Sequence, residues 1–78
     1  EQLSRVEGAE AVLYRGGFRH FRVRSHGEIA RIELAQDELP RLMESDRCAE
    51  ISARLKALGF KFVTVDLEGY RPGGVTLS

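Results

Sequence analysis

The sequence lacks several features that mark well-known classes of protein. It has a single cysteine, Cys48, so no disulfide can close within the chain, and we expect a reducing, cytoplasmic location. No apolar run approaches the roughly 18 residues of a membrane-spanning helix, and we expect no membrane partner. The 12 basic and 12 acidic residues cancel to a formal net charge of zero. Nucleic-acid-binding domains usually carry a basic excess, so we expect no nucleic-acid partner.

The chain also lacks the motifs of a self-sufficient enzyme. The glycines near its C-terminal end form neither a Walker loop nor a dinucleotide-binding pattern. His20, His26 and Cys48 do not have the spacing of zinc ligands, so we predict no metal site. Cys48 falls on the apolar stripe of a predicted helix, which favours a core residue over a nucleophile. We therefore expect no catalytic residue and no cofactor within this chain.

What is present is the composition of a small globular protein. The chain has 78 residues, of which 42% are hydrophobic and 31% are charged. This length predicts one small domain over residues 1–78, which buries about 60% of the surface of its unfolded chain. Because the sequence starts at Glu1 without a methionine, we expect it to be part of a longer protein.

Periodicity predicts two main helices and three strands. Apolar residues recur at helical spacing in residues 3–15 and 45–58, and glycine follows each segment. A short helical turn is expected at residues 38–43. Residues 18–25, 28–34 and 60–67 alternate as strands do, with a turn at Gly27 and a further short strand at residues 75–77. The resulting order, α-β-β-α-β, predicts an α+β two-layer sandwich with a small, mainly antiparallel sheet and helices on one face. We place the first strand at its centre.

The two strands of the hairpin have one apolar and one basic face. Alternation gives the apolar face Phe21, Val23, Ala30, Ile32 and Leu34. It gives the other face of the sheet Phe18, His20, Arg22, Arg24, Ile29, Arg31, Glu33, Phe62, Thr64 and Asp66.

Two interpretations of this second face remain open. It is either a solvated surface with weak ion pairs, Arg31 with Glu33 or Arg24 with Asp66, or a contact surface. Arginines at alternate strand positions point the same way, which suits bidentate capture of a phosphate or carboxylate. The second interpretation predicts an anionic small-molecule substrate or a neighbouring domain as the partner.

Three stretches of the sequence are similar to one family. Residues 22–33, RVRSHGEIARIE, resemble the RVRHHGDxARIE signature of the C-terminal region of LarE-type proteins, with Ser25 in place of the first histidine. Residues 58–71, LGFKFVTVDLEGYR, are similar to the closing LGFKYVTLDLEGYR of that family. Residues 5–10 also resemble the segment that leads into the hairpin. These are ATP-dependent sacrificial sulfur transferases of the PP-loop ATP pyrophosphatase superfamily.

The resemblance implies that this chain is the C-terminal domain of a larger enzyme. In the family, an N-terminal PP-loop domain binds ATP with magnesium and adenylates a pyridinium biscarboxylate mononucleotide. A cysteine then donates its sulfur and becomes dehydroalanine, and the product feeds the assembly of a nickel-pincer nucleotide cofactor. Neither the PP-loop nor the donor-cysteine motif lies in this chain, and Cys48 is outside the donor motif.

The resemblance also implies site residues and partners. Arg22 and Arg24 match the family pattern and are implied to lie near the substrate phosphate, with Glu10 and Arg71 as further matches. Arg31, from the basic face, completes the predicted substrate- and anion-binding set. The implied partners are the N-terminal PP-loop domain of the same protein and further copies in a homo-oligomer.

Two other classes of function compete with this hypothesis. One is a free-standing module for small-ligand binding or oligomerisation, without catalytic activity. The other is an RNA-binding sheet that uses Phe18, His20 and Phe62 as stacking platforms, which zero net charge disfavours.

The 78-residue chain by itself is expected not to hydrolyse ATP, because none of its stretches forms a phosphate-binding loop. A phosphate-release assay with magnesium and ATP measures this, with the heat-denatured chain as the blank. Turnover above the blank would contradict the assignment of ATP chemistry to another part of the protein.

Overall fold

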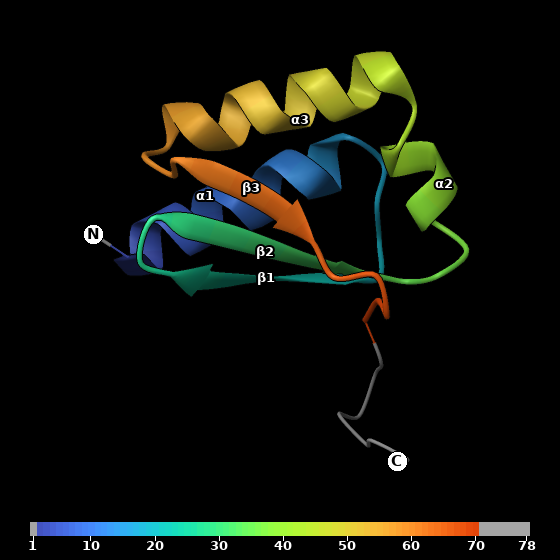
Figure 1. Ribbon diagram of the computed structural model, residues 1–78, viewed down its shortest axis with the longest axis horizontal. Helices are drawn as coiled ribbons and strands as arrows, with labels where there is room; N and C mark the ends of the chain where they lie inside the picture. Colours follow the sequence, from blue (N-terminus) through green and yellow to red (C-terminus); the bar gives the residue numbers. More distant parts are fainter. Residues whose placement is uncertain (1, 71–78) are drawn as a thin grey trace.

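The computed structural model describes residues 2–70 and shows an α+β fold, as the periodicity predicts. Its elements follow in the order α1 (Gln2–Arg15), β1 (Phe21–His26), β2 (Ile29–Leu34), α2 (Leu39–Leu42), α3 (Ser45–Ala57) and β3 (Phe62–Val65). The helices lie on one side of a three-stranded sheet (Figure 1). The strand predicted at residues 75–77 lies outside the described residues.

The sheet is mixed, and β2 is its central strand. β1 pairs antiparallel with β2, with Val23 opposite Ile32. β3 pairs in parallel on the other side, with Ala30 beside Val63. The expectation of a central first strand was wrong. The tight turn at Gly27, where φ is 62°, returns the chain directly beside β1, whereas the parallel strand β3 needs the helical crossover through α3.

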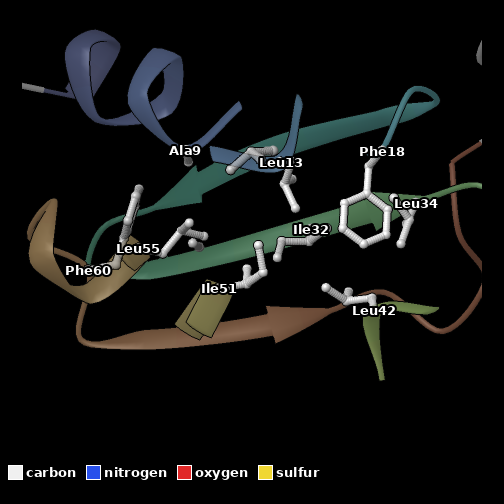
Figure 2. Packing of buried hydrophobic residues seen from close by; sticks show 11 residues of the cluster. Ala9, Leu13, Phe18, Ile32, Leu34, Leu42, Ile51, Leu55 and Phe60 are labelled. Atoms are coloured by element: carbon white, nitrogen blue, oxygen red, sulfur yellow. The ribbon is translucent and has the colours of Figure 1, made fainter. Parts of the chain in front are cut away.

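The core forms between the inward face of β2 and the helices. Ala30, Ile32 and Leu34 are all at most 1% exposed, which confirms the predicted apolar face of the hairpin. Figure 2 shows Leu13 of α1 and Ile51 of α3 reaching toward β2. Their burial follows from the helical spacing of the apolar residues on both helices, which places one stripe of each against the sheet.

Phe18 belongs to this core, and its predicted place on the outer face of the sheet was wrong. The first strand begins only at Phe21, because Gly17 takes a φ of 97° and turns the chain after α1. The amide of Phe18 then donates to the carbonyl of Leu13 at 3.1 Å, and its ring is wholly buried. The guanidinium carbon of Arg41 lies 4.2 Å from the centre of the ring. Phe18 is therefore not available as a stacking platform.

We expect Phe18→Ala to lower the free energy of unfolding by about 3–5 kcal/mol, because it leaves a cavity in the core. Phe62→Ala is the matched control, since Phe62 is 59% exposed and its loss should cost well under about 1 kcal/mol. Urea denaturation followed by circular dichroism measures both. Equal losses for the two variants would show that Phe18 does not have the buried position described here.

Candidate functional site

The face of the sheet turned away from the helices carries most of the predicted site residues. We call it the open face, and its residues on the strands are Arg22, Arg24, His26, Ile29, Arg31, Glu33, Phe62 and Thr64. Their positions follow from the period of two, since the residues between them point into the core. Asp66 follows β3 directly and joins this face through its ion pair with Arg31.

Glu33 is the centre of an ion-pair network on the open face. Its Oε1 accepts a hydrogen bond from Nε of Arg24 at 3.3 Å, and its Oε2 accepts one from Nη2 of Arg31 at 3.1 Å. Arg31 also reaches Oδ2 of Asp66 at 3.9 Å. The predicted pair of Arg31 with Glu33 is confirmed, but Arg24 pairs with Glu33 and not with Asp66. Two arginines and two carboxylates therefore balance one another here.

Arg22 is the source of surplus positive charge on this face. It stands opposite Glu33 in the strand register, yet both oxygens of Glu33 are bonded to other arginines. The guanidinium carbon of Arg22 lies 5.7 Å from the ring centre of Tyr70, at the limit of a cation–π contact. Within residues 2–70, Arg22 forms no ion pair with a carboxylate. Its guanidinium can therefore accept an anion from outside the described chain.

Tyr70 is held beside Arg22 by the backbone. Its amide donates to the carbonyl of Leu34 at 3.0 Å, which ties the segment after β3 to the end of β2. The sequence did not indicate this contact, because Tyr70 and Arg22 are far apart in the chain. The open face thus gains an aromatic neighbour for its unpaired arginine.

Glu10 lies on α1 and not on the open face. Its Oε2 accepts a hydrogen bond from the amide of Val23 at 3.1 Å, at the edge of β1. Arg22 and Arg24 flank Val23, so Glu10 holds the backbone between the two arginines. This contact supports a positioning role, and binding of substrate by Glu10 stays a prediction. Arg71, the remaining predicted site residue, lies outside the described residues.

Two apolar side chains share the open face with these charges. Ile29 and Phe62 stand beside each other in the parallel register, and they are 38% and 59% exposed. Adjacent exposed apolar residues on a sheet are typical of a surface that meets another molecule. The hydroxyl of Thr64, next along β3, is already used, because it donates to the carbonyl of Ala30 at 3.0 Å.

The described residues offer no metal centre. Among residues 2–70, no group of three or more histidine, cysteine, aspartate or glutamate side chains is arranged to hold a metal ion. None of the helices in that part of the chain is both long and apolar enough to cross a membrane.

Comparison with known proteins finds a LarE-type protein among the relatives of this chain. No protein-family model matches it. Over 74 residues, 94% of the chain, it is 40% identical to the pyridinium-3,5-bisthiocarboxylic acid mononucleotide synthase of Lactiplantibacillus plantarum, a LarE-type protein of the PP-loop superfamily. This chain is a relative of the LarE-type proteins. It is also 40% identical over 73 residues to an uncharacterized protein of Synechocystis sp..

The chain spans about a quarter of the length of the curated relatives it matches, 26% of the Lactiplantibacillus protein and 27% of the Synechocystis protein. The resemblance read from residues 22–33 and 58–71 is thereby confirmed.

We expect Glu10→Ala to lower the free energy of unfolding by about 1.5–3 kcal/mol, because it leaves the amide of Val23 without its charged acceptor. Glu10→Gln keeps an acceptor oxygen and should lower the free energy of unfolding by less. Hydrogen exchange of the Val23 amide, followed by NMR, reports the contact directly. Unchanged protection of that amide in Glu10→Ala would contradict the positioning role.

Proposed function

We propose that this chain is the C-terminal accessory domain of a LarE-type, ATP-dependent sulfur transferase. In this proposal its open face binds the phosphate or carboxylate of a mononucleotide substrate. The observation that carries the proposal is Arg22, which lies on this face without a carboxylate partner among the described residues. The Lactiplantibacillus relative is named as the synthase of a pyridinium bisthiocarboxylic acid mononucleotide, which supports a pyridinium mononucleotide as the substrate class.

Arg24 is the second anion-binding residue in this proposal. It shares Glu33 with Arg31, which is held in addition by Asp66. When Arg24 turns toward a ligand, Glu33 therefore keeps one cationic partner and is not left as a lone half-buried carboxylate. Arg22 and Arg24 point to the same side of β1, so two guanidiniums can hold one phosphate through charge-assisted, bidentate hydrogen bonds.

The chain contributes recognition rather than chemistry in this proposal. ATP and magnesium belong to a PP-loop domain in the rest of the longer protein, and so does the sulfur-donating cysteine. Cys48 is half-buried and lines an apolar hollow together with Ile51, Val63 and Val65, with no cationic residue among the described residues of the lining that would activate a thiol. A reducing, cytoplasmic location is part of the proposal.

The open face also has a role in assembly under this proposal. Ile29 and Phe62 form an exposed apolar pair next to the arginines. A neighbouring domain or a second subunit that covers this pair would shield the anion site from water and strengthen its electrostatic contacts. The site is then complete only when the sheet meets another part of the protein.

In the full-length protein, we expect Arg22→Ala combined with Arg24→Ala to lower kcat/KM for sulfur transfer by about 10–100-fold, because charged hydrogen bonds to substrate are lost. Lys56→Ala combined with Lys61→Ala is the matched control, since it removes two exposed cations elsewhere and should leave the rate unchanged. Steady-state kinetics with the mononucleotide as the varied substrate measure both. A folded Arg22/Arg24 variant with the full rate would refute the anion-binding role.

A further inference from the structure

A second group of arginines lines a pocket on the helical side of the molecule. The pocket lies between the end of α1 and one face of α3 and has a volume of about 220 Å³. Its lining residues are Val12, Arg15, Gly16, Arg47, Glu50, Ile51 and Arg54. Those from α3 recur at intervals of three and four residues, so they form one stripe that faces α1.

The pocket has an excess of positive charge. Three arginines line it against one carboxylate, that of Glu50, which pairs with Nε of Arg54 at 3.2 Å. Within residues 2–70, Arg15 forms no ion pair with an acidic side chain. Nη1 of Arg47 donates to the carbonyl of Gly16 at 3.1 Å. Arg47 also forms an ion pair with Glu44 at 3.8 Å, so Arg15 is the arginine of this pocket that no acid of the described residues neutralises.

Arg47 retains an unused donor. Its Nε is shielded from water and has no hydrogen-bond partner in the described structure. An oxygen of the Glu44 carboxylate is 3.8 Å away, which is too long for a hydrogen bond. Buried donors are nearly always satisfied in native proteins, by protein groups or by ordered water, and Nε of Arg31 on the open face is in the same state as Nε of Arg47.

Stabilisation of the C-terminal end of α1 explains the presence of only some of these arginines. Arginines near the C-terminal end of a helix stabilise its exposed carbonyls. Arg41 and Arg47 do so here, since both donate to the carbonyl of Gly16, at 3.2 and 3.1 Å. Neither Arg15 nor Arg54 has such a contact in the described residues. The carbonyl that would repel an anion at this end of α1 is thus already capped, while Arg15 keeps a guanidinium that no acidic side chain of residues 2–70 pairs with and Arg54 shares its own with Glu50.

We propose that this pocket binds an oxyanion of the phosphate class, either inorganic phosphate or the phosphate group of a nucleotide. Arg15, Arg47 and Arg54 supply the donors, and the apolar side chains of Val12 and Ile51 form part of the lining. The pocket lies on the helical side and the open face on the other side of the sheet, so the two anion sites are independent of each other.

The test is an NMR titration of the protein with inorganic phosphate and, separately, with adenosine monophosphate, at constant ionic strength. We expect amide shifts at Gly16, Arg47 and Glu50 with either probe. Similar affinities would identify the phosphate group alone as the ligand, and tighter binding of the nucleotide would identify a nucleotide site. Absence of shifts in the pocket with both probes would overturn the proposal.

Substitutions that change the charge of the pocket test whether its arginines bind the phosphate. Arg15→Gln combined with Arg54→Gln should weaken binding at least about tenfold, since charged hydrogen bonds are lost. Glu50→Gln should strengthen it, because the competing carboxylate is removed. Lys56→Gln combined with Lys61→Gln removes the same charge outside the pocket and should change the affinity less than about twofold.

The same spectra distinguish this proposal from the function proposed for the open face. Shifts confined to Arg22, Arg24 and their neighbours would contradict phosphate binding in the pocket and would still support an anion site on the open face. Thermal unfolding shows whether the Arg15/Arg54 variant is folded. If the folded variant binds phosphate as tightly as the wild type, the pocket arginines do not bind the anion and the proposal is refuted.

Discussion

The burial of one face of the central strand is the constraint on which the rest of this structure depends. Ala30, Ile32 and Leu34 are almost completely buried, and they share one core cluster with apolar residues of both main helices. Because successive side chains alternate, Ile29, Arg31 and Glu33 must then lie on the opposite side. A shift of one residue in the register would exchange the two faces and bury Arg31 and Glu33. The packing of the core thus determines the geometry of the charged surface, which explains how a small chain can present an ordered set of arginines.

The distribution of charge reconciles the two proposed anion sites with a net charge of zero. Glu33 and Asp66 neutralise Arg24 and Arg31, which leaves Arg22 as the local surplus on the open face. On the helical side, the carboxylate of Glu50 is outnumbered in its pocket by three arginines. Both surpluses are small and local, in contrast to the broad basic surface that a polyanion such as RNA requires. This pattern favours small anionic ligands.

The sequence predicts most of the fold because the pattern of apolar residues is consistent over each element. The apolar stripes of α1 and α3, the two faces of the hairpin and the glycine after each helix are all as expected. Phe18 was misplaced because an apolar residue just after a glycine pair fits the start of a strand as well as it fits a core position. The strand order could not be read from alternation, since alternation assigns faces and not neighbours.

The candidate site was only partly predictable, because alternation assigns side chains to a face of the sheet but does not say which of them contact one another. Alternation placed Arg22, Arg24, Arg31 and Glu33 on one face, but which arginine takes the carboxylate depends on the register and on side-chain reach. The contact of Tyr70 with Arg22 and the pocket of Arg15 and Arg47 join residues that are distant in the chain. No local pattern in the sequence marks such contacts.

The central claim is that the open face recognises the anionic groups of a mononucleotide, and a site-resolved NMR titration tests it most directly. Nicotinic acid mononucleotide is a suitable probe, because it combines a pyridinium carboxylate with one phosphate. This account predicts saturable shifts of the amides and the Nε–Hε groups of Arg22 and Arg24, reduced in the Arg22→Ala variant. Resonances on the open face that do not move at millimolar probe, in a protein that remains folded, would contradict it.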